Sequence, residues 1–366
     1  MIIGILGGGQ LGRMLALAGY PLGLRFRFFE PAEEAAVDGL AERLRADYDD
    51  YDALARFASG LDAVTYEFEN VPIDAVRFLA GRVPHVYPPV AALAVSQDRV
   101  LEKEFFGREG IPTPPFEAVD SEAQLHGAVE RIGLPAVLKT RRFGYDGKGQ
   151  ALLKTAGEAS DAWQRLGGVP LILERFIPFE RELSMIAVRG RDGEACCYPL
   201  IQNLHRDGML RRSIAPAPDV PPAAQNQAMR HALATLEALE YVGVLSIEFF
   251  LAGELLLANE MAPRVHNSGH WTIEGAATSQ FENHLRACLG LALGSAVVNG
   301  YVAMVNLIGT VPNLDAAYRL PDTHVHLYGK TPRLGRKLGH ITVRADDPDQ
   351  LQERLDALAA AGIEVE

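Results

Sequence analysis

Cysteine is scarce in this chain, with three among 366 residues. Cys196 and Cys197 are neighbours, a pair that rarely forms a bridge, and Cys288 is distant from both in the sequence. None of the three belongs to a spacing typical of a zinc site. We therefore expect free thiols in a reducing cytoplasm and no disulfide framework.

Positive charge is also in short supply. Lysine and arginine number 35 against 47 aspartates and glutamates, which gives a formal net charge of -12. Binding to a nucleic-acid backbone needs a basic surface, so we exclude that class of partner. Three local basic clusters stand out against this background and indicate small anionic ligands, although each alone also fits a solvated surface: Arg141/Arg142/Lys148, Arg211/Arg212 and Lys330/Arg333/Arg336/Lys337.

Long hydrophobic runs are missing. The segment 289–309 carries no charge over about the length of a membrane span, but Ser295, Asn299, Asn306 and four glycines interrupt it. We expect it to form a helix end, a turn and a strand, Tyr301 to Ile308. The first residues, Met-Ile-Ile-Gly-Ile-Leu, have no charged leader, so we expect no signal peptide.

The segment 136–150 is the most informative part of the chain. A short apolar run after Pro135 predicts a buried strand that ends at Lys139. Three glycines then follow within six residues, between arginines, an aspartate and a lysine, and such a loop presents backbone amides and cations to an anion. The pattern predicts a loop that covers phosphate, and hence an enzyme that uses a nucleotide.

A second glycine pattern lies at the amino terminus. Gly7, Gly9 and Gly12 have the spacing Gly-x-Gly-x-x-Gly between a predicted strand, 2–6, and a predicted helix, 13–19. A second strand, 24–29, ends in Glu30, where a dinucleotide fold keeps its ribose-binding acid. An NAD-dependent oxidoreductase is therefore an alternative, although any parallel sheet with a tight first turn can show this spacing.

The order of predicted elements suggests three domains. Strands 63–66 and 83–89 close an α/β unit, and the acids after Tyr66 fit either a ligand site at a strand end or a solvated loop. A helix, 97–109, leads into a second unit, in which we expect strand 171–177 to pair antiparallel with 182–188 and strand 194–200 to continue the sheet. This change to antiparallel pairing indicates an α+β region. We predict domains 1–95, 96–290 and 291–366.

Two acids on neighbouring apolar strands predict a metal site. Segments 243–250 and 255–260 read as a hairpin that brings Glu248 and Glu260 together, with Asn259 beside them. Adjacent carboxylates raise each other's pKa unless a cation lies between them, and Mg²⁺ prefers such oxygen ligands. The alternative is two acids on a solvated strand face. The polar string 262–272, which contains His266 and His270, follows directly and indicates substrate handling.

These features together resemble the ATP-grasp superfamily and, within it, the N5-carboxyaminoimidazole ribonucleotide synthetase family of purine biosynthesis. The resemblance rests on motifs that occur in family order at residues 7–14, 65–72, 97–99, 144–150, 259–272 and 335–340. It implies a Rossmann-like preATP-grasp domain, a central ATP-grasp region with the glycine loop 141–150, and a small β-rich C-terminal domain. One departure is Phe143, where the family usually has a second glycine.

The resemblance also implies roles for single residues. ATP would be bound by Arg99, Lys139, the loop Gly144, Tyr145, Asp146, Gly147, Lys148, Gly149 and Gln150, the adenine-lining stretch Glu174, Arg175, Phe176 and Ile177, and by Glu182, His205, Asn259 and Glu260. Arg175 has no role of its own within that stretch. Mg²⁺ would be held by Glu248 and Glu260. The ribonucleotide and carbonate would be bound by Glu67, Tyr145, Asp146, Arg264, His266, Lys330 and Arg336, with Asp146, Lys148, Arg264 and His266 as catalytic residues.

The implied reaction is the ATP-dependent carboxylation of 5-aminoimidazole ribonucleotide with bicarbonate through carboxyphosphate, carried out by a cytoplasmic homodimer. Three alternatives remain open from the sequence. One is another ATP-grasp ligase that joins a carboxylate to an amine, one is the NAD-dependent oxidoreductase, and one is a catalytically silent binding protein that keeps the fold.

Overall fold

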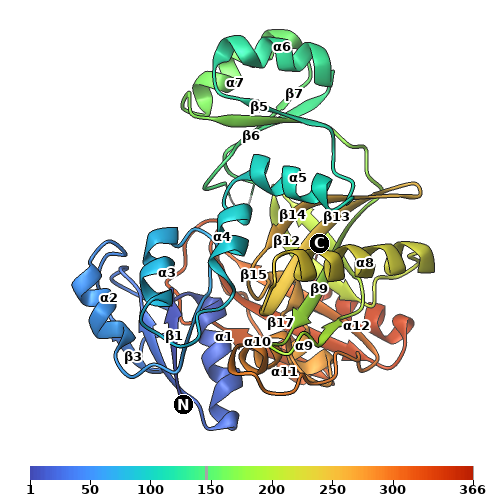
Figure 1. Ribbon diagram of the computed structural model, residues 1–366. Coiled ribbons are helices and arrows are strands. Elements are labelled where there is room, and N and C mark those ends of the chain that lie inside the picture. Colours follow the sequence, from blue (N-terminus) through green and yellow to red (C-terminus); the bar gives the residue numbers. More distant parts are fainter. Residues whose placement is uncertain (145–146, 366) are drawn as a thin grey trace.

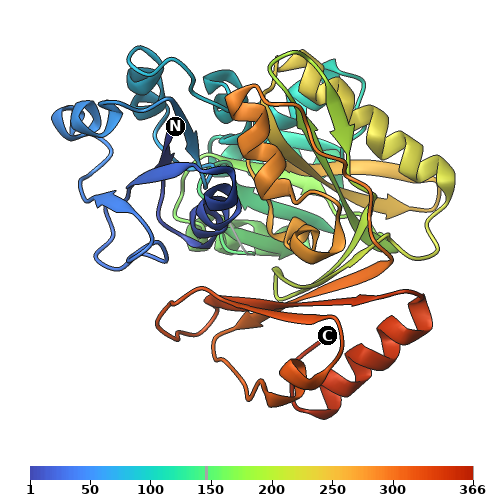
Figure 2. The same ribbon diagram turned by 90° about the horizontal axis from the view of Figure 1, so that it is seen from below.

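The computed structural model describes residues 1–144 and 147–365, which form three sheets (Figures 1 and 2). The first sheet is parallel, in the order β3-β2-β1-β4. Strands β1 and β4 are almost wholly buried, as expected for apolar strands with helices on both faces. The elements of this unit are β1 (Ile2–Leu6), α1 (Gln10–Gly19), η1 (Tyr20–Leu22), β2 (Arg25–Phe29), β3 (Glu42–Leu44), α2 (Tyr51–Ala58), β4 (Ala63–Tyr66) and α3 (Ile73–Ala80).

The predicted strand 83–89 is wrong. This segment makes one isolated parallel bridge, between Val64 and Val86. Pro84, Pro88 and Pro89 lack the backbone N–H that a ladder needs, so the pairing cannot extend. The predicted helix 97–109 is confirmed as α5 (Arg99–Arg108), which begins where the Asp98 carboxylate accepts from the amides of Val100 and Leu101. A separate short helix, α4 (Val90–Ser96), precedes it.

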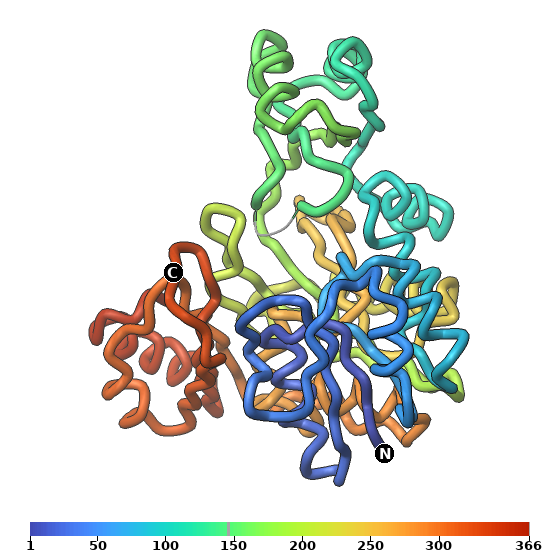
Figure 3. Tube along the Cα trace, turned by 90° about the vertical axis from the view of Figure 1, so that its left-hand side faces the viewer, coloured from blue at the N-terminus to red at the C-terminus, as the bar shows by residue number. Residues whose placement is uncertain are grey.

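A small lobe projects from the rest of the molecule (Figure 3). Its antiparallel sheet has the order β5-β8-β6-β7, with two helices on one face. The Ser121 hydroxyl accepts from the Gln124 amide and caps the first of these helices, as the sequence predicts. The elements are β5 (Phe116–Val119), α6 (Glu122–Ile132), β6 (Ala136–Thr140), β7 (Gln150–Leu153), η2 (Ala156–Glu158), α7 (Ala159–Arg165) and β8 (Leu171–Arg175).

The third sheet has nine strands, in the order β14-β13-β9-β11-β12-β15-β17-β16 with β10 beside β9. It runs without a break from β12 into β15, and Figure 2 shows α11 and α12 packed beside its last strands. The elements are β9 (Arg181–Arg189), β10 (Ala195–Cys197), β11 (Ile201–Arg206), β12 (Met209–Ala215), α8 (Pro222–Ala238), β13 (Gly243–Ala252), β14 (Leu255–Ala262), η3 (Asn267–Gly269), α9 (Thr272–Gly275), α10 (Gln280–Leu289), β15 (Tyr301–Ile308), α11 (Asp315–Arg319), β16 (Thr323–Leu327), β17 (Lys337–Ala345) and α12 (Pro348–Ala360).

The predicted pairing of 171–177 with 182–188 is also wrong. β8 pairs with β5 and β6 in the small lobe, whereas β9 pairs with β10, β11 and β13 in the large sheet. Six consecutive residues of β9 are buried, so this strand needs neighbours and covering layers that the four-stranded lobe does not offer. The connection 176–180 therefore crosses from one sheet to the other.

One hydrophobic core joins residues of the first sheet to residues of the large sheet and of the helices beside it. It includes Phe28 of the first sheet, Ile186 and Trp271 of the middle region, and Met304 of β15. The strand Tyr301–Ile308 appears as predicted. Among the described residues, we find no helix with the length and apolar character to cross a membrane.

Candidate active site

A cleft of about 1280 Å³ lies where the small lobe, the first sheet and the large sheet meet. It is lined by every predicted site residue that the structure describes except Gly149. Tyr145 and Asp146 lie outside the described residues. Lining residues to which the sequence analysis assigned no individual role include Gln10, Gln97, Glu102 and Asn267.

Lys139, at the end of β6, is held by an acid and an amide. Its Nζ lies 2.9 Å from Glu174 Oε2 and 3.5 Å from Asn259 Oδ1. Lys103 Nζ lies 3.4 Å from the same Glu174 oxygen, and its side chain is fully buried. Burial alone would raise the pKa of the Glu174 carboxyl, but the charges of Lys103 and Lys139 outweigh it and bring the pKa to about 2. Glu174 is therefore ionised, holds Lys139 at the cleft wall and pairs with the buried Lys103 behind it.

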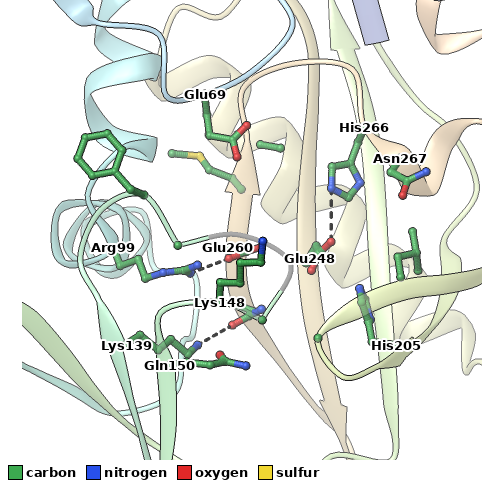
Figure 4. A pocket seen from close by; sticks show the side chains of 18 of the residues that line it. Glu69, Arg99, Lys139, Lys148, Gln150, His205, Glu248, Glu260, His266 and Asn267 are labelled. Carbon is green, nitrogen blue, oxygen red and sulfur yellow. Dashed lines mark hydrogen bonds and ion pairs between the residues drawn. The ribbon is translucent and has the colours of Figure 1, made fainter. Parts of the chain in front are cut away.

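The two acids of the predicted hairpin are direct cross-strand partners, Glu248 on β13 and Glu260 on β14. The expectation that they lie together is confirmed, and both line the cleft rather than a solvated face. Arg99 Nη1 lies 2.6 Å from Glu260 Oε2 (Figure 4). Burial would raise the pKa of Glu260, but Arg99 lowers it well below its ordinary value. Glu248 has no such arginine, so burial and the charge of Glu260 raise its pKa to about 7.

His266 is oriented between its loop and the acid pair (Figure 4). Its Nδ1 accepts from the Ser268 amide at 3.3 Å, so in the neutral ring Nε2 carries the proton and points at Glu248 Oε1, 3.4 Å away. Burial, followed by the charges of Arg264 and Lys337, lowers the pKa of His266 to about 3. The ring is neutral at neutral pH.

The Gly7–Gly12 turn binds carboxylates of its own chain. The Gly9 and Gly12 amides donate to Glu67, and the Gly8 amide donates to Glu30 Oε2 at 2.7 Å. A Cβ at Gly9 would lie 2.6 Å from Glu67 Oε1, so this glycine lets the acid reach the start of α1. The amides that would receive a dinucleotide pyrophosphate are thus already bonded, which argues against the NAD-dependent alternative.

Two of the three basic clusters contain arginines that pair with acids distant in the sequence, although Arg141 and Lys148 of the first cluster also line the cleft. Arg141 and Arg142 pair with Asp98, at 3.0 and 3.2 Å. Arg211 pairs with Glu364 at 3.4 Å, and neither Arg211 nor Arg212 lines the cleft, so this cluster does not belong to the candidate active site and its interpretation as a ligand site stays a prediction. In both clusters an arginine pairs with an acid that is far away in the sequence, and nothing in the local sequence indicates this partner.

The third basic cluster does reach the cleft, in the loop before β17. Lys330 donates to Gln10 of the first unit, and Arg336 Nη1 donates to the Thr331 carbonyl at 3.1 Å. Arg333 and Lys337 line the same wall. This loop therefore presents a basic surface opposite the small lobe.

Further pairs connect the cleft walls. Arg264 forms an ion pair with Glu69 across the first and third sheets, and Glu69 lies in the motif after β4. His205 Nδ1 lies 2.9 Å from Glu182 Oε2 on neighbouring strands. A Cβ at Gly147 would lie 2.8 Å from Gly208 Cα, so the glycine loop approaches the β11–β12 turn closely. Phe143 has a left-handed backbone, with φ of 62°, and is 72% exposed.

No group of three or more His, Cys, Asp or Glu side chains capable of holding a metal ion occurs among the described residues. The Glu248–Glu260 pair instead fits the way proteins bind Mg²⁺, through one or two carboxylates together with substrate phosphates. Burial, followed by the charge of Glu260, raises the pKa of Glu248, and a cation held by the pair would favour its ionised form.

Three family comparisons cover most of the chain. Residues 1–97 match the ribonucleotide synthetase preATP-grasp domain, residues 104–281 match the ATP-grasp domain, and residues 302–354 match the phosphoribosylaminoimidazole carboxylase C-terminal domain.

Similar proteins span the whole length. An N5-carboxyaminoimidazole ribonucleotide synthase of Pseudomonas aeruginosa is 51% identical over 98% of this chain and 99% of its own. The crystal structure of the synthetase from Thermus thermophilus is 58% identical, with a TM-score of 0.94 and 98% of both chains covered. The synthase from Aspergillus clavatus, solved with ADP and 5-aminoimidazole ribonucleotide, is 30% identical, with a TM-score of 0.91 and 98% of both chains covered.

Proposed function

Because the chain belongs to the N5-carboxyaminoimidazole ribonucleotide synthase family of ATP-grasp ligases, we propose that it carboxylates 5-aminoimidazole ribonucleotide in purine biosynthesis. The products are N5-carboxyaminoimidazole ribonucleotide, ADP and phosphate. The observation that carries this is the cross-strand pair Glu248/Glu260 facing Arg99 and Lys139 in one cleft, within a chain similar to these synthases from end to end.

ATP lies between the small lobe and the large sheet. Arg99 and Lys139 contact its phosphates, and residues 144–150 cover them. The stretch 174–177 lines the adenine, and Glu182 with His205 contacts the nucleotide. The support for this arrangement is that the described members of this set, apart from Gly149, line one cleft, and that Glu174 holds Lys139 in place.

Glu248 and Glu260 would hold Mg²⁺, with Asn259 beside them. When bound, the ion offsets the charge of the phosphate oxygens. Arg99 and Lys139 supply fixed positive charge in the same place, and this favours attack by a bicarbonate oxygen on the γ-phosphorus and departure of ADP. The product of that step is carboxyphosphate, which water hydrolyses. The loop 144–150 over the phosphates therefore serves to exclude water from this intermediate.

The ribonucleotide binds on the opposite side, with its phosphate at Lys330 and Arg336 and its base near Glu67, Arg264 and His266. Tyr145, Asp146 and Lys148 complete this set. Carboxyphosphate separates into phosphate and carbon dioxide, and the amine nitrogen bonds to the carbon and loses a proton. The neutral His266 lies beside this point and can take that proton, and Asp146 is the alternative base.

The domains 1–95, 96–290 and 291–366, a homodimer and a cytoplasmic location belong to the same proposal. Mass in solution tests the homodimer, and a monomer at micromolar concentration would contradict it.

The test of the activity is ADP formation with each substrate omitted in turn. We expect ADP release to require ATP and Mg²⁺ and to rise when bicarbonate and 5-aminoimidazole ribonucleotide are both present. If ADP release does not depend on the ribonucleotide, or depends on formate instead, the protein is another ligase of this fold.

Glu260→Gln should lower kcat by about 100-fold or more, because a negative charge that organises the site is lost. The matched control is Glu254→Gln, the same change at the exposed turn of the same hairpin, which should leave kcat unchanged.

A further inference from the structure

A buried polar chain links three walls of the cleft, and none of its members has a role in the function proposed above. His270 and His340 are fully buried and Tyr328 is 1% exposed. Asn267 and Asn306 are also buried and connect the same side chains to the β11–β12 hairpin. Groups of this polarity are costly to bury unless they are hydrogen-bonded, and in both histidine rings it is Nδ1 that has a partner, whereas Nε2 is buried without one among the described residues.

The donor and acceptor of each amide hydrogen bond in this polar chain can be assigned from the Leu210 carbonyl. Asn306 Nδ2 donates to the Leu210 carbonyl at 2.9 Å, and a carbonyl can only accept, which sets the Asn306 amide. Asn306 and Asn267 then exchange two bonds, of 2.9 and 3.1 Å, each nitrogen donating to the other's oxygen. The amide of Asn267 is thereby set as well.

The same logic sets both histidines. Asn267 Nδ2 lies 3.1 Å from His270 Nδ1, so that ring nitrogen accepts and the neutral ring carries its proton on Nε2. The Tyr328 hydroxyl has one proton and two ring nitrogens within reach, His270 Nδ1 at 3.2 Å and His340 Nδ1 at 2.7 Å. If the hydroxyl donates to His270, His340 Nδ1 can donate to the hydroxyl oxygen and both contacts are hydrogen bonds, which is the arrangement we adopt. His326 stacks on His340 with ring centroids 4.4 Å apart and holds the ring in place.

The chain ends beside functional residues at both sides. Asn267 lines the cleft and follows His266 directly (Figure 4). Tyr328 stands two residues before Lys330, whose Nζ lies 5.8 Å from the Tyr328 ring centroid. Leu210 lines the cleft from the β11–β12 hairpin.

We propose that Tyr328, through its hydroxyl bonds to His270 and His340, is a positioning residue that sets the basic loop 329–337 relative to the His266 loop. The inference rests on the proposed function, because it predicts an effect on the ribonucleotide and none on ATP. Loss of the hydroxyl leaves the His340 donor without an acceptor and releases the base of the loop that carries Lys330.

Tyr328→Phe tests the role in catalysis. The KM for 5-aminoimidazole ribonucleotide should rise about tenfold, the equivalent of one buried hydrogen bond, while the KM for ATP stays within about a factor of two. The matched control is Tyr241→Phe, which removes an equally buried hydroxyl that donates to the Val244 carbonyl away from the cleft, and should change neither constant. Equal effects of the two variants would overturn the role.

Two further comparisons separate positioning from simple stability. Lys330→Ala and Tyr328→Phe act on the same contact, so the double variant should raise the ribonucleotide KM no further than Lys330→Ala alone. If the rise in the ribonucleotide KM of the double variant equals the product of the two single rises, the proposal is wrong. His340→Asn keeps a donor near the Nδ1 position, so its KM for 5-aminoimidazole ribonucleotide should stay close to the parent value. His340→Leu removes the donor, and its KM for the ribonucleotide should rise as in Tyr328→Phe.

Nitrogen-15 NMR of histidine-labelled protein tests the chain without any activity. We expect His340 as the Nδ1–H tautomer and His270 as the Nε2–H tautomer; His340 protonated on Nε2 would overturn the chain. If the parent protein forms no ribonucleotide-dependent ADP, the proposed function fails and the tautomers still decide the network. If it does form ADP and Tyr328→Phe keeps its KM, the positioning role fails alone.

Discussion

Phe143 occupies a backbone conformation that suits glycine. Its φ of 62° lies in the left-handed region, where a side chain with a Cβ costs about 1 kcal/mol, and its ring is 72% exposed. The departure from the family pattern thus has a local explanation: the main chain keeps the glycine geometry and the ring points to solvent.

Phe143→Gly should therefore leave the ratio of ADP formed to ribonucleotide carboxylated unchanged. Glycine adopts the same backbone without strain, so the protein should gain up to about 1 kcal/mol of stability from that term. Phe143→Ala is the control, because it removes the ring and keeps the Cβ. A changed ratio in both variants would mean that the ring itself helps to exclude water.

Other residue positions show how far sequence reasoning reaches. The contact of Glu248 with Glu260 could be predicted, because two apolar runs around one turn fix the register locally. The capture of Arg141 by Asp98 could not, since the two are 43 positions apart and nothing local marks either as a partner. The sequence shows Lys103 one helical turn after Arg99, but it does not show that Lys103 is buried. That burial depends on the placement of Glu174 on β8 of the small lobe.

At the scale of elements, α10 is attached to two sheets through His284. The Val244 amide donates to Nδ1 at 3.1 Å, so Nε2 carries the proton and donates to Thr65 Oγ1 at 2.7 Å. Only the neutral ring can make both bonds. Burial lowers the pKa of His284 to about 4, which is consistent with this requirement.

This attachment predicts a pH dependence of stability. Below about pH 6.5 the histidine is protonated in the unfolded chain, whereas in the folded protein it stays neutral down to about pH 4. The free energy of unfolding therefore decreases as the pH falls through this window, by up to about 1.4 kcal/mol per pH unit. His284→Asn keeps an acceptor and removes the titration, and its free energy of unfolding should decline less steeply than that of the parent. Urea titrations between pH 7 and pH 4 measure both. The exposed His324→Asn should follow the parent, and parallel curves for all three proteins would refute the assignment.

Strand partners were the least predictable part of the fold. The sequence places β8 and β9 five residues apart, which favours a hairpin, yet they belong to different sheets. Pairing depends on which layers cover each face, and that information is distributed over the whole chain. Element types were predicted well where a cap or a clear apolar run occurs, as in α6 and β15.

At the scale of the whole molecule, the small lobe has a hydrophobic core of its own. The residues of that core lie between Val119 and Leu173, whereas the largest core draws on segments from Ile3 to Tyr328. Such a unit can open without unfolding the rest, because few apolar contacts hold it to its neighbours.

Hydrogen exchange with and without Mg-ATP tests this independence. Amides of β6 should exchange through a lower-energy opening than those of β13. ATP at 100 times its Kd should slow β6 exchange roughly 100-fold, as expected when ligand binds only the closed state. Helix α2, which is remote from the cleft, serves as the internal reference and should not respond. Equal protection of β6 and β13 in the free protein would show that the lobe unfolds only with the whole chain.

The occupied turn at the start of α1 bears on inhibitor selectivity. Compounds that mimic a pyrophosphate and bind the glycine turn of dehydrogenases would have to displace Glu67 and Glu30, two charges that are already part of the chain. Such compounds should bind this protein weakly at the turn. A phosphate mimic directed at the loop of Lys330 and Arg336 would instead meet cations that a dehydrogenase turn does not present, so one anionic group in a compound could distinguish the two kinds of enzyme.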